Sequence, residues 1–271
     1  ITVLPDYYPT RTEASIFERN LPEMAKATNI ENGAIIDLGA GSCDKAPRLF
    51  PHVKPSQYVP VDISVEHLRA TVTRLQREHP DIEMIGVGTD FSSNLVLPKQ
   101  VQAERRLFFY PGSSIGNFTP DQALVFLQQV RSHVQTDGAL WLGIDLIKDH
   151  VMLERAYDDE LGVTAAFNLN ILRNVNRIAG TDFHPSDWQH HARFDAQKSR
   201  IEMLLEARAE TTVRWPNGER TFSAGERIHT ESSYKYTPDS FRTLLEQAGL
   251  RPIGMWTDDQ SWFAFFAAVL A

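Results

Sequence analysis

The sequence predicts an α/β protein, in which a mostly parallel sheet is covered by helices and a smaller α+β region is inserted. Two observations support this class. From residue 34 to residue 146, short apolar runs alternate with helix-compatible segments, which is typical of a parallel sheet with helices on both faces. Acids close several of these runs, among them Asp37, Asp62 and Asp145, and the carboxyl ends of parallel strands share the edge at which ligands bind.

The pattern changes after the fifth apolar run. Residues 148–236 contain helical segments followed by β-rich stretches, with polar side chains inside apolar surroundings. A last helix and a pair of apolar strands then complete the chain. We therefore expect one domain formed by residues 1–147 together with 237–271, and a second domain formed by residues 148–236.

The individual elements follow from apolar periodicity and from turn residues. The first domain begins with an extended aromatic segment at 7–11. We expect its helices at 12–28, 44–50, 65–79 and 238–248, with one more that starts at 120. We expect its strands at 34–37, 57–64, 82–87, 106–110, 139–146, 251–257 and 262–270. In the second domain we expect helices at 151–161 and 164–179, followed by a polar, histidine-rich connection at 188–194. Residues 199–209 and 211–215 are expected to form a β-hairpin arm, which returns through a Pro-Asn-Gly turn to 220–222. A further segment follows at 228–236.

The composition is that of an ordinary globular protein, with 42% hydrophobic and 23% charged residues among 271. The net charge of −8 argues against a nucleic-acid partner, which needs a basic face, so a small-molecule substrate is the better expectation. No apolar run is long enough to cross a membrane, and the single cysteine, Cys43, fits a reducing compartment. We expect a cytoplasmic monomer. The chain begins at Ile1 without a methionine, like the middle of a longer protein whose leading segment is absent.

The stretch A-I-I-D-L-G-A-G-S-C-D-K, residues 34–45, contains a buried strand, a glycine-rich turn and the start of a helix. Gly39 and Gly41 let the backbone approach a ligand closely, and the first helical turn offers unpaired N–H groups. The stretch lacks the third glycine of the dinucleotide fingerprint and is not a P-loop. An acid followed by G-x-G is similar to the first motif of S-adenosylmethionine (SAM) methyltransferases, although an ordinary strand–turn–helix unit has the same pattern.

Four further residues at this sheet edge suit a nucleoside-bearing cofactor. Asp62 closes the second strand, where an acid can bind ribose hydroxyls, and it is equally typical of a helix cap. Asp90 and Phe91 follow the third strand, where they can accept from an adenine amino group and pack on its ring; a turn next to a core aromatic residue has the same pattern. Lys45 is either a contact for the SAM carboxylate or a solvated surface charge.

Other kinds of site have weaker signals. The densest group of histidines, His184, His190 and His191, matches no metal-ligand spacing, so we expect no metal. No G-x-S-x-G motif supports a serine hydrolase, and Cys43 is expected to be a packing residue. Glu231 lies on a half-buried segment and needs a partner, which is either a structural cation or a cationic or N–H-bearing substrate.

Several motifs in a fixed order indicate a family. They are Y-Y-P-T-R-T-E, L-G-A-G-S-C-D-K, V-D-I-S, D-F, P-G-S-S-I-G-N, D-L-I-K-D, L-E-R-A-Y-D-D-E-L-G-V-T-A-A-F-N-L-N-I-L, R-I-E-M and T-E-S-S-Y-K-Y. Together they resemble the histidine Nα-methyltransferases of ergothioneine biosynthesis over essentially the whole chain. The resemblance implies a Rossmann-like SAM-dependent methyltransferase domain with an inserted α+β substrate-binding domain. It also implies three methyl transfers from SAM that convert L-histidine to trimethylhistidine (hercynine).

The resemblance also assigns site residues. It places SAM on Gly39, Lys45, Asp62, Asp90 and Phe91, and the substrate carboxylate on Asn117 and Tyr157. It counts Gly112 among the substrate-binding residues and places the imidazole near Tyr7, Glu231 and Ser233, with Met203 beside it. It assigns no general base. Members of the family begin earlier and carry another tyrosine near the substrate amine, and they often have an aliphatic residue where this chain has Ser232.

The reaction that these assignments imply is an in-line displacement, in which the neutral α-amine attacks the SAM methyl group. Two alternatives remain open from the sequence. One is a SAM-dependent methyltransferase of another amine or amino acid, such as a tryptophan derivative. The other is a non-catalytic relative that binds SAM or a betaine.

Overall fold

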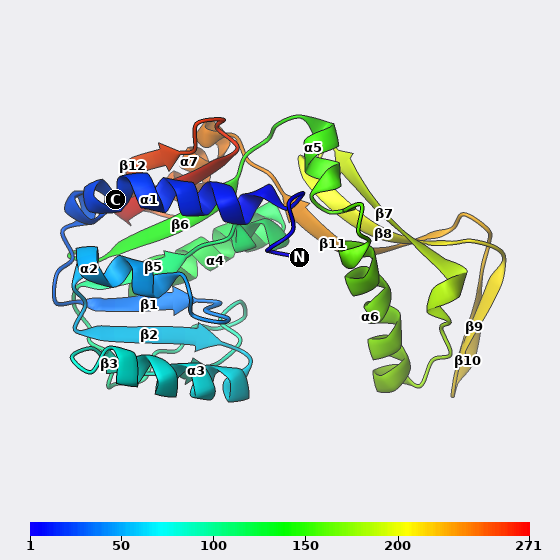
Figure 1. The fold of residues 1–271 in the computed structure, drawn as a ribbon, viewed down its shortest axis with the longest axis horizontal. Coiled ribbons are helices and arrows are strands. Elements are labelled where there is room, and N and C mark those ends of the chain that lie inside the picture. Colours follow the sequence, from blue (N-terminus) through cyan, green and yellow to red (C-terminus); the bar gives the residue numbers. More distant parts are fainter. The chain divides into compact units, whose positions relative to one another are not determined.

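The structure is a computed structural model that describes all residues, Ile1–Ala271. Contacts between Cα atoms divide the chain into two compact units. The sheet unit consists of Arg11–Leu146 and Tyr236–Ala271, and the insert unit consists of Ile1–Thr10 and Ile147–Lys235. The first ten residues, which the sequence assigns to the sheet domain, thus group with the insert. Figure 1 shows the elements of both units, and each unit is described by itself.

The sheet unit contains an eight-stranded, mostly parallel sheet, which confirms the predicted α/β class. Its strands are β1 (Ala34–Leu38), β2 (Gln57–Asp62), β3 (Glu83–Met84), β4 (Val87–Gly88), β5 (Arg106–Tyr110), β6 (Ala139–Asp145), β12 (Leu250–Thr257) and β13 (Phe263–Leu270). Their order is β12-β13-β6-β5-β1-β2-β3, with β4 also paired to β2. Only β12 and β13 run antiparallel to their neighbours.

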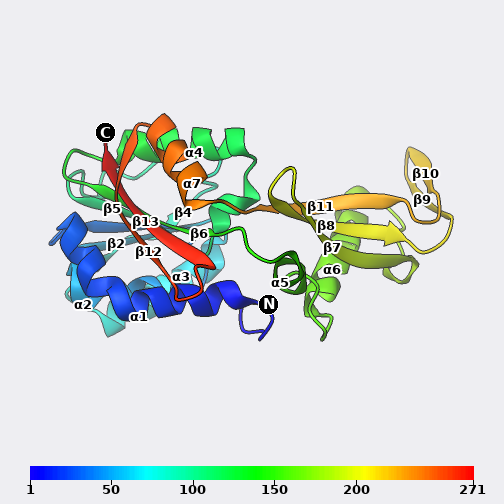
Figure 2. The same ribbon diagram turned by 90° about the horizontal axis from the view of Figure 1, so that it is seen from above.

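Helices cover both faces of this sheet (Figure 2). They are α1 (Tyr8–Thr28), η1 (Ala46–Leu49), α2 (Phe50–Val53), α3 (Val65–Glu78), η2 (Ser114–Asn117), α4 (Pro120–His133) and α7 (Pro238–Gln247). Adjacent side chains of β13 point to opposite faces of the sheet, since Phe265 packs on Phe17 of α1 while Phe266 packs on Phe241 of α7. No helix of the chain is both long and apolar enough to cross a membrane.

Two predicted elements of the sheet unit are wrong. The extended segment expected at 7–11 is the first turn of α1, which begins at Tyr8 because Pro9 occupies a position whose N–H has no helical partner. The strand expected at 82–87 is split into β3 and β4. Between them, a Cβ atom at Gly86 would lie 3.3 Å from Val72 of α3, so that the helix packs closely against the break.

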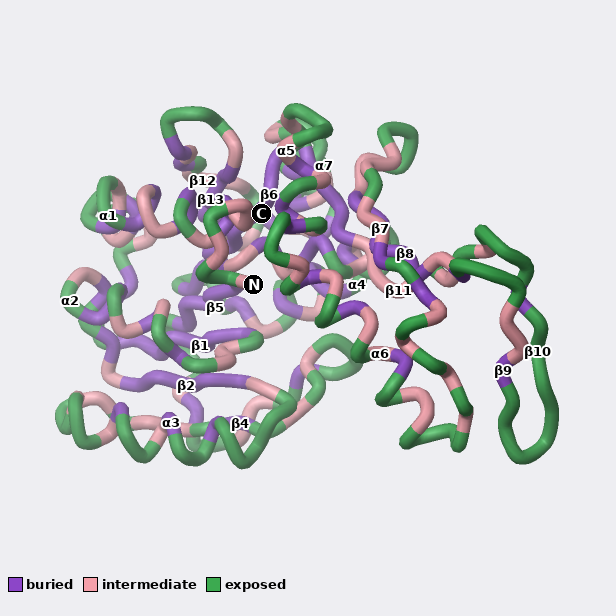
Figure 3. Tube along the Cα trace, turned by 45° about the vertical axis from the view of Figure 1, so that its right-hand side comes forward, coloured by how far each residue is buried: buried purple, intermediate pink, exposed green.

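The insert unit contains a three-stranded antiparallel sheet and a separate hairpin. The sheet has the order β11 (Arg227–Tyr234), β8 (Arg200–Ala207), β7 (Trp188–Asp195), and the hairpin pairs β9 (Thr211–Trp215) with β10 (Gly218–Phe222). The helices are α5 (His150–Arg155), α6 (Val163–Ala179) and η3 (Pro185–Asp187). Its core gathers six buried apolar residues, namely Leu172, Trp188, Leu205, Ala207, Val213 and Phe222. The hairpin is largely exposed (Figure 3).

Three predictions for the insert are wrong. The polar connection at 188–194 is strand β7, whose inward position 190 is a buried histidine and therefore hides the apolar alternation. The segment expected at 199–209 does not form a hairpin with 211–215, because β8 pairs with β7 and β11 instead. The helix expected at 151–161 ends at Arg155.

Thr119 caps α4, and replacing it with alanine is expected to lower the free energy of unfolding by about 1 kcal/mol. Its hydroxyl accepts from the Gln122 N–H at 3.3 Å, while the Gln122 side chain accepts from the Thr119 N–H at 2.9 Å. Urea unfolding measures the change. The Thr119→Ser variant keeps the acceptor, so an equal loss in that variant would contradict a role for the hydroxyl.

Candidate active site

The glycine-rich turn lies over the carboxyl ends of β1 and β2. The N–H groups of Gly39 and Ala40 donate to the Val61 carbonyl at 2.9 and 3.2 Å. Gly39 has a φ of +70°, which favours glycine, and a Cβ atom there would lie 3.5 Å from the ring of Phe91. The backbone of Gly39 and the ring of Phe91 are therefore neighbours, and a larger side chain at residue 39 would fill the space between them.

Asp62 has a fixed carboxylate at this edge. One oxygen accepts from the Gly41 N–H and the other from the Ser64 N–H, both at 2.9 Å. The bond from the Ser64 N–H is the local bond expected of an acid in a turn, so Asp62 also stabilises the turn before α3. Each carboxylate oxygen keeps a lone pair, so Asp62 can still accept from the hydroxyl groups of a ligand.

Asp90 is engaged within its own turn. Its Oδ1 accepts from the Ser92 N–H at 3.0 Å and from the Ser92 hydroxyl at 2.5 Å, and these bonds lower the pKa of Asp90. The neighbouring Phe91 ring is half-buried and lies 5.9 Å from Tyr110 and 6.1 Å from Phe126, measured between ring centroids. Asp90 is thus an exposed anion beside an aromatic cluster.

Lys45 directly precedes η1 and lies outside it, although the helix expected at 44–50 included it. Its Nζ contacts Glu13 Oε2 at 2.5 Å, and Glu13 Oε1 accepts from the Gly112 N–H at 2.6 Å. The sequence reasoning missed Glu13, which is only 1% exposed. A usable signal exists, because Glu13 stands one helical turn before Ile16 and Phe17 on the buried face of α1.

The loop after β5 carries Gly112 and Asn117. Gly112 has a φ of +76°, and Ser113 has a φ of +58°. The Ser113 hydroxyl accepts from the Asp145 N–H at 2.8 Å, which ties the loop to the end of β6. Asn117, the last residue of η2, is exposed, so its amide is accessible to a ligand.

The insert unit contains a partly open cavity of about 230 Å³. It is smaller than the roughly 300–1,000 Å³ of cavities that hold drug-sized ligands, and suits a ligand such as a single amino acid. Four residues that the resemblance assigns to the substrate line it, namely Tyr7, Tyr157, Met203 and Glu231; its other lining residues are Ile1, Thr2, Ala156, Thr164 and Phe167.

A register shift in β11 directs Glu231 into this cavity. His229 pairs with Leu204 and Glu231 pairs with Met203, which leaves Thr230 as an extra residue. Upstream of the shift, Ile228 pairs with Leu205 and packs on the apolar core of the insert. Regular alternation would send residues 228 and 231 to opposite faces. The extra residue keeps both on one face, so that one supplies the core and the other the cavity.

Tyr157, Ser233 and Lys235 form a triangle of hydrogen bonds. The Tyr157 and Ser233 hydroxyls lie 2.9 Å apart, and Lys235 Nζ donates to each at 2.9 Å. Tyr7 packs edge-on against Tyr157, with ring centroids 6.1 Å apart. Lys235 is buried and was not singled out from the sequence, although it follows T-E-S-S-Y directly.

Glu231 is the acid of the cavity. Burial raises its pKa above the usual value for glutamate, and the charge of Lys235 opposes that shift. Since a desolvated carboxylate gains most from a ligand that donates an N–H or carries a positive charge, the cavity favours such a ligand over a neutral hydrocarbon.

The buried histidine behind Tyr157 is structural. Asn168 Nδ2 donates to His190 Nδ1 at 2.9 Å, so the ring must donate from Nε2 to the Tyr157 carbonyl, 2.8 Å away. Of the histidines that the sequence singled out, His190 thus holds a backbone group in place. No group of three or more His, Cys, Asp or Glu side chains is arranged to hold a metal ion. Burial raises the pKa of the Cys43 thiol to about 11, so it stays protonated.

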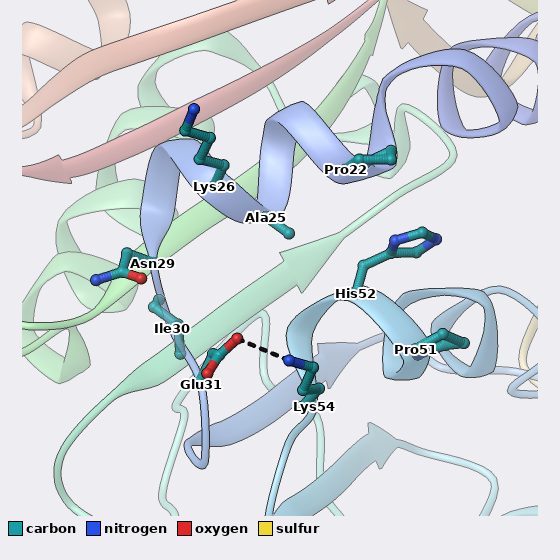
Figure 4. A pocket seen from close by; sticks show the side chains of 9 residues that line it. All are labelled: Pro22, Ala25, Lys26, Asn29, Ile30, Glu31, Pro51, His52 and Lys54. Atoms are coloured by element: carbon teal, nitrogen blue, oxygen red, sulfur yellow. Dashed lines mark hydrogen bonds and ion pairs between the residues drawn. The ribbon is translucent and has the colours of Figure 1, made fainter.

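A second hollow lies at the opposite, amino-terminal edge of the sheet strands (Figure 4). Its volume is about 370 Å³, and its lining includes the ammonium groups of Lys26 and Lys54 and the imidazole of His52. Lys54 pairs with Glu31 at 3.1 Å, and more than half of each of these side chains is exposed. Parallel α/β sheets bind ligands at the other edge, so the glycine-rich turn remains the candidate site of this unit.

Comparison with known proteins finds matches over nearly the whole chain. Residues 1–270 match the family described as histidine-specific, SAM-dependent methyltransferases. A histidine N-alpha-methyltransferase of Mycobacterium tuberculosis is 38% identical over 99% of this chain and 84% of its own length. Ergothioneine biosynthesis protein 1 of Neurospora crassa is 31% identical over 95% of this chain and 30% of its own length.

Among solved structures, a SAM-dependent methyltransferase from Clostridium acetobutylicum is similar, with a TM-score of 0.54. It is 13% identical in sequence, and the match covers 95% of this chain and 92% of that chain. At this identity the similarity supports the fold alone.

Proposed function

The chain belongs to the histidine-specific, SAM-dependent methyltransferases, and we propose that it transfers three methyl groups in turn from SAM to the α-amine of L-histidine to form hercynine. The family and the use of SAM, both predicted from the sequence, are confirmed. The substrate, the number of transfers and the residue roles are the proposal. We assign SAM to the sheet unit and the imidazole to the insert unit.

Observations in the sheet unit fit the methyl donor. The Asp62 carboxylate is fixed beside the glycine-rich turn and has free lone pairs for ribose hydroxyls. Gly39 leaves space against the Phe91 ring that a Cβ atom would fill. We propose that Gly39, Lys45, Asp62, Asp90 and Phe91 hold SAM, which supplies an electrophilic methyl group when bound.

The observation that carries the choice of histidine is the cavity around Glu231. Its carboxylate can accept from an imidazole N–H, while Met203 packs beside it. Between the hydroxyls of Tyr157 and Ser233 only one hydrogen is used, so one remains for the substrate carboxylate or the second ring nitrogen. Lys235 donates to both hydroxyls and therefore favours their role as donors to the substrate. We place the substrate carboxylate on Tyr157, Asn117 and the loop that Gly112 opens.

The residues act mainly by orientation. The α-amine of a peptide has a pKa near 8 and that of a free amino acid a higher one, so only a small fraction is neutral at neutral pH. The scheme draws on this fraction and assigns no general base. Orientation of two reactants accounts for up to about 7–11 kcal/mol of a barrier in ideal cases. Glu231 is an imidazole anchor in this scheme. We also propose that the protein is a cytoplasmic monomer without a membrane partner; the single cysteine fits a reducing compartment, and the net charge of −8 argues against a nucleic-acid partner.

The test is a product assay by mass spectrometry. Incubation with SAM and L-histidine is expected to give mono-, di- and trimethylhistidine together with S-adenosylhomocysteine, and Nα,Nα-dimethylhistidine should be converted to hercynine. Parallel reactions contain L-tryptophan and imidazole-methylated histidine. Turnover of tryptophan without turnover of histidine would contradict the proposed substrate. Binding of both ligands without S-adenosylhomocysteine over hours would show a non-catalytic binding protein.

A further inference from the structure

Glu13 is a buried carboxylate that joins two loops of the sheet unit. It lies in α1, is 1% exposed, and uses both oxygens: Oε2 contacts Lys45 Nζ at 2.5 Å and Oε1 accepts from the Gly112 N–H at 2.6 Å. Its two partners are far apart in sequence, one after β1 and the other after β5. A buried carboxylate that satisfies both oxygens in this way holds both partners firmly, because loss of either bond is costly.

The surrounding structure leaves Glu13 little freedom to move. A Cβ atom at Gly143 of β6 would lie 2.9 Å from Glu13 Oε1, so the absence of a side chain there makes room for the carboxylate. A Cβ atom at Gly112 would lie 3.2 Å from Lys45 Nζ, so the two partners lie near each other. Because both bind the same carboxylate, a displacement of Lys45 or of Gly112 acts on the other through Glu13.

Each partner belongs to a different part of the proposed reaction. Lys45 is assigned to the carboxylate of SAM, and it has two further ammonium hydrogens and a side chain that is 40% exposed. Gly112 opens the loop that ends at Asn117, which is assigned to the carboxylate of histidine. These two assignments, and the inference drawn from them, rest on the proposed function.

We propose that Glu13 is a positioning residue that couples cofactor binding to substrate binding. When the cofactor carboxylate fixes Lys45, the Glu13 carboxylate fixes the Gly112 N–H and with it the start of the substrate loop. Each ligand then raises the affinity for the other by the same factor, as thermodynamic linkage requires. Glu13 itself touches neither ligand.

Calorimetric titration of L-histidine, with and without saturating S-adenosylhomocysteine, measures this factor. We expect the wild-type chain to bind histidine at least about fivefold more tightly when S-adenosylhomocysteine is present, at the lower end of ordinary couplings between sites. In Glu13→Gln, which loses the charge that pairs with Lys45, the ratio is expected to fall close to one. Glu18→Gln, an exposed acid of the same helix, should keep the wild-type ratio.

The ratio of the histidine affinities with and without S-adenosylhomocysteine separates coupling from a purely structural role of Glu13. If Glu13 only stabilised the fold, Glu13→Gln would lower the melting temperature and leave the ratio of affinities unchanged, and that result would overturn the proposal. A wild-type ratio of one would overturn it as well. Should Glu13→Gln fail to fold, the double variant Glu13→Gln with Lys45→Met removes both charges together, and a retained ratio in that variant contradicts the coupling.

Failure of the proposed function gives a different result. A wild-type chain that binds S-adenosylhomocysteine but not histidine would refute the substrate, and the coupling with it. A wild-type chain that binds and methylates histidine, yet shows the same ratio as Glu13→Gln, would refute the coupling alone.

Discussion

Replacing Glu231 by glutamine is expected to weaken the binding of L-histidine by roughly 10- to 150-fold, which corresponds to the 1.5–3 kcal/mol of a hydrogen bond to a charged group. The carboxylate is half-buried, which raises its pKa, and it lies opposite Met203 in the cavity wall. Glutamine has nearly the same shape, so the cavity should persist while the anionic acceptor is lost. Calorimetric titration with S-adenosylhomocysteine present measures the change, and the alanine variant should be affected at least as strongly.

The control for this experiment is Glu210→Gln, an exposed acid of the same unit, which should bind histidine like the wild type. The affinity for S-adenosylhomocysteine, which we assign to the other unit, should not change in either variant. An unchanged histidine affinity in Glu231→Gln and Glu231→Ala would exclude Glu231 as the imidazole anchor.

Replacing Asp37 by asparagine is expected to remove a large pH dependence of stability. Asp37 closes β1, is 2% exposed, and accepts from the Tyr58 hydroxyl at 2.7 Å. Burial raises its pKa from 3.8 to about 7, although the bond from Tyr58 opposes the shift. The folded chain therefore holds one more proton than the unfolded chain between these two values. The stability that this proton contributes is complete below pH 3.8 and is lost as the pH rises through about 7.

Asparagine is neutral throughout and can still accept from Tyr58. Relative to the wild type, the variant should therefore gain about 2.7 kcal/mol of stability as the pH rises from 5 to 8, because only the part of the shift between pH 5 and about 7 falls in this window. Urea unfolding of the ligand-free protein at both pH values measures the difference. Asp81→Asn, at an exposed position of the same unit, should show no such trend. A constant difference between Asp37→Asn and wild type at the two pH values would exclude a proton on Asp37.

The parts of the site that the sequence predicts are those encoded locally. The glycine turn and Asp62 each follow an apolar strand directly, so their place at the sheet edge needs only the strand order of a parallel sheet. That Glu231 needs a partner is also predictable, because a charged residue in a half-buried segment has to be compensated, but the sequence leaves open whether the partner is a structural cation or a ligand.

What the sequence could not predict depends on distant pairing. Glu13 lies 32 residues from Lys45 and 99 residues from Gly112, and no periodicity relates them. Strand β7 was missed because its inward position carries His190, whose partners Asn168 and Tyr157 come from a different helix and loop. In both cases a polar group occupies a core position, which only the assembled fold explains.

The extra residue in β11 determines which side chains of this strand line the cavity. Because Thr230 is left out of the ladder, Glu231 emerges on the same face as Ile228, and the position of the acid depends on how the strand pairs as much as on its composition. A deletion of Thr230 would keep this arrangement, since Glu231 would then follow Ile228 by two residues of a regular strand. A pairing that brings Thr230 into the ladder would instead exchange the inward and outward sets of the residues that follow it. The lining of this cavity can thus change without any substitution.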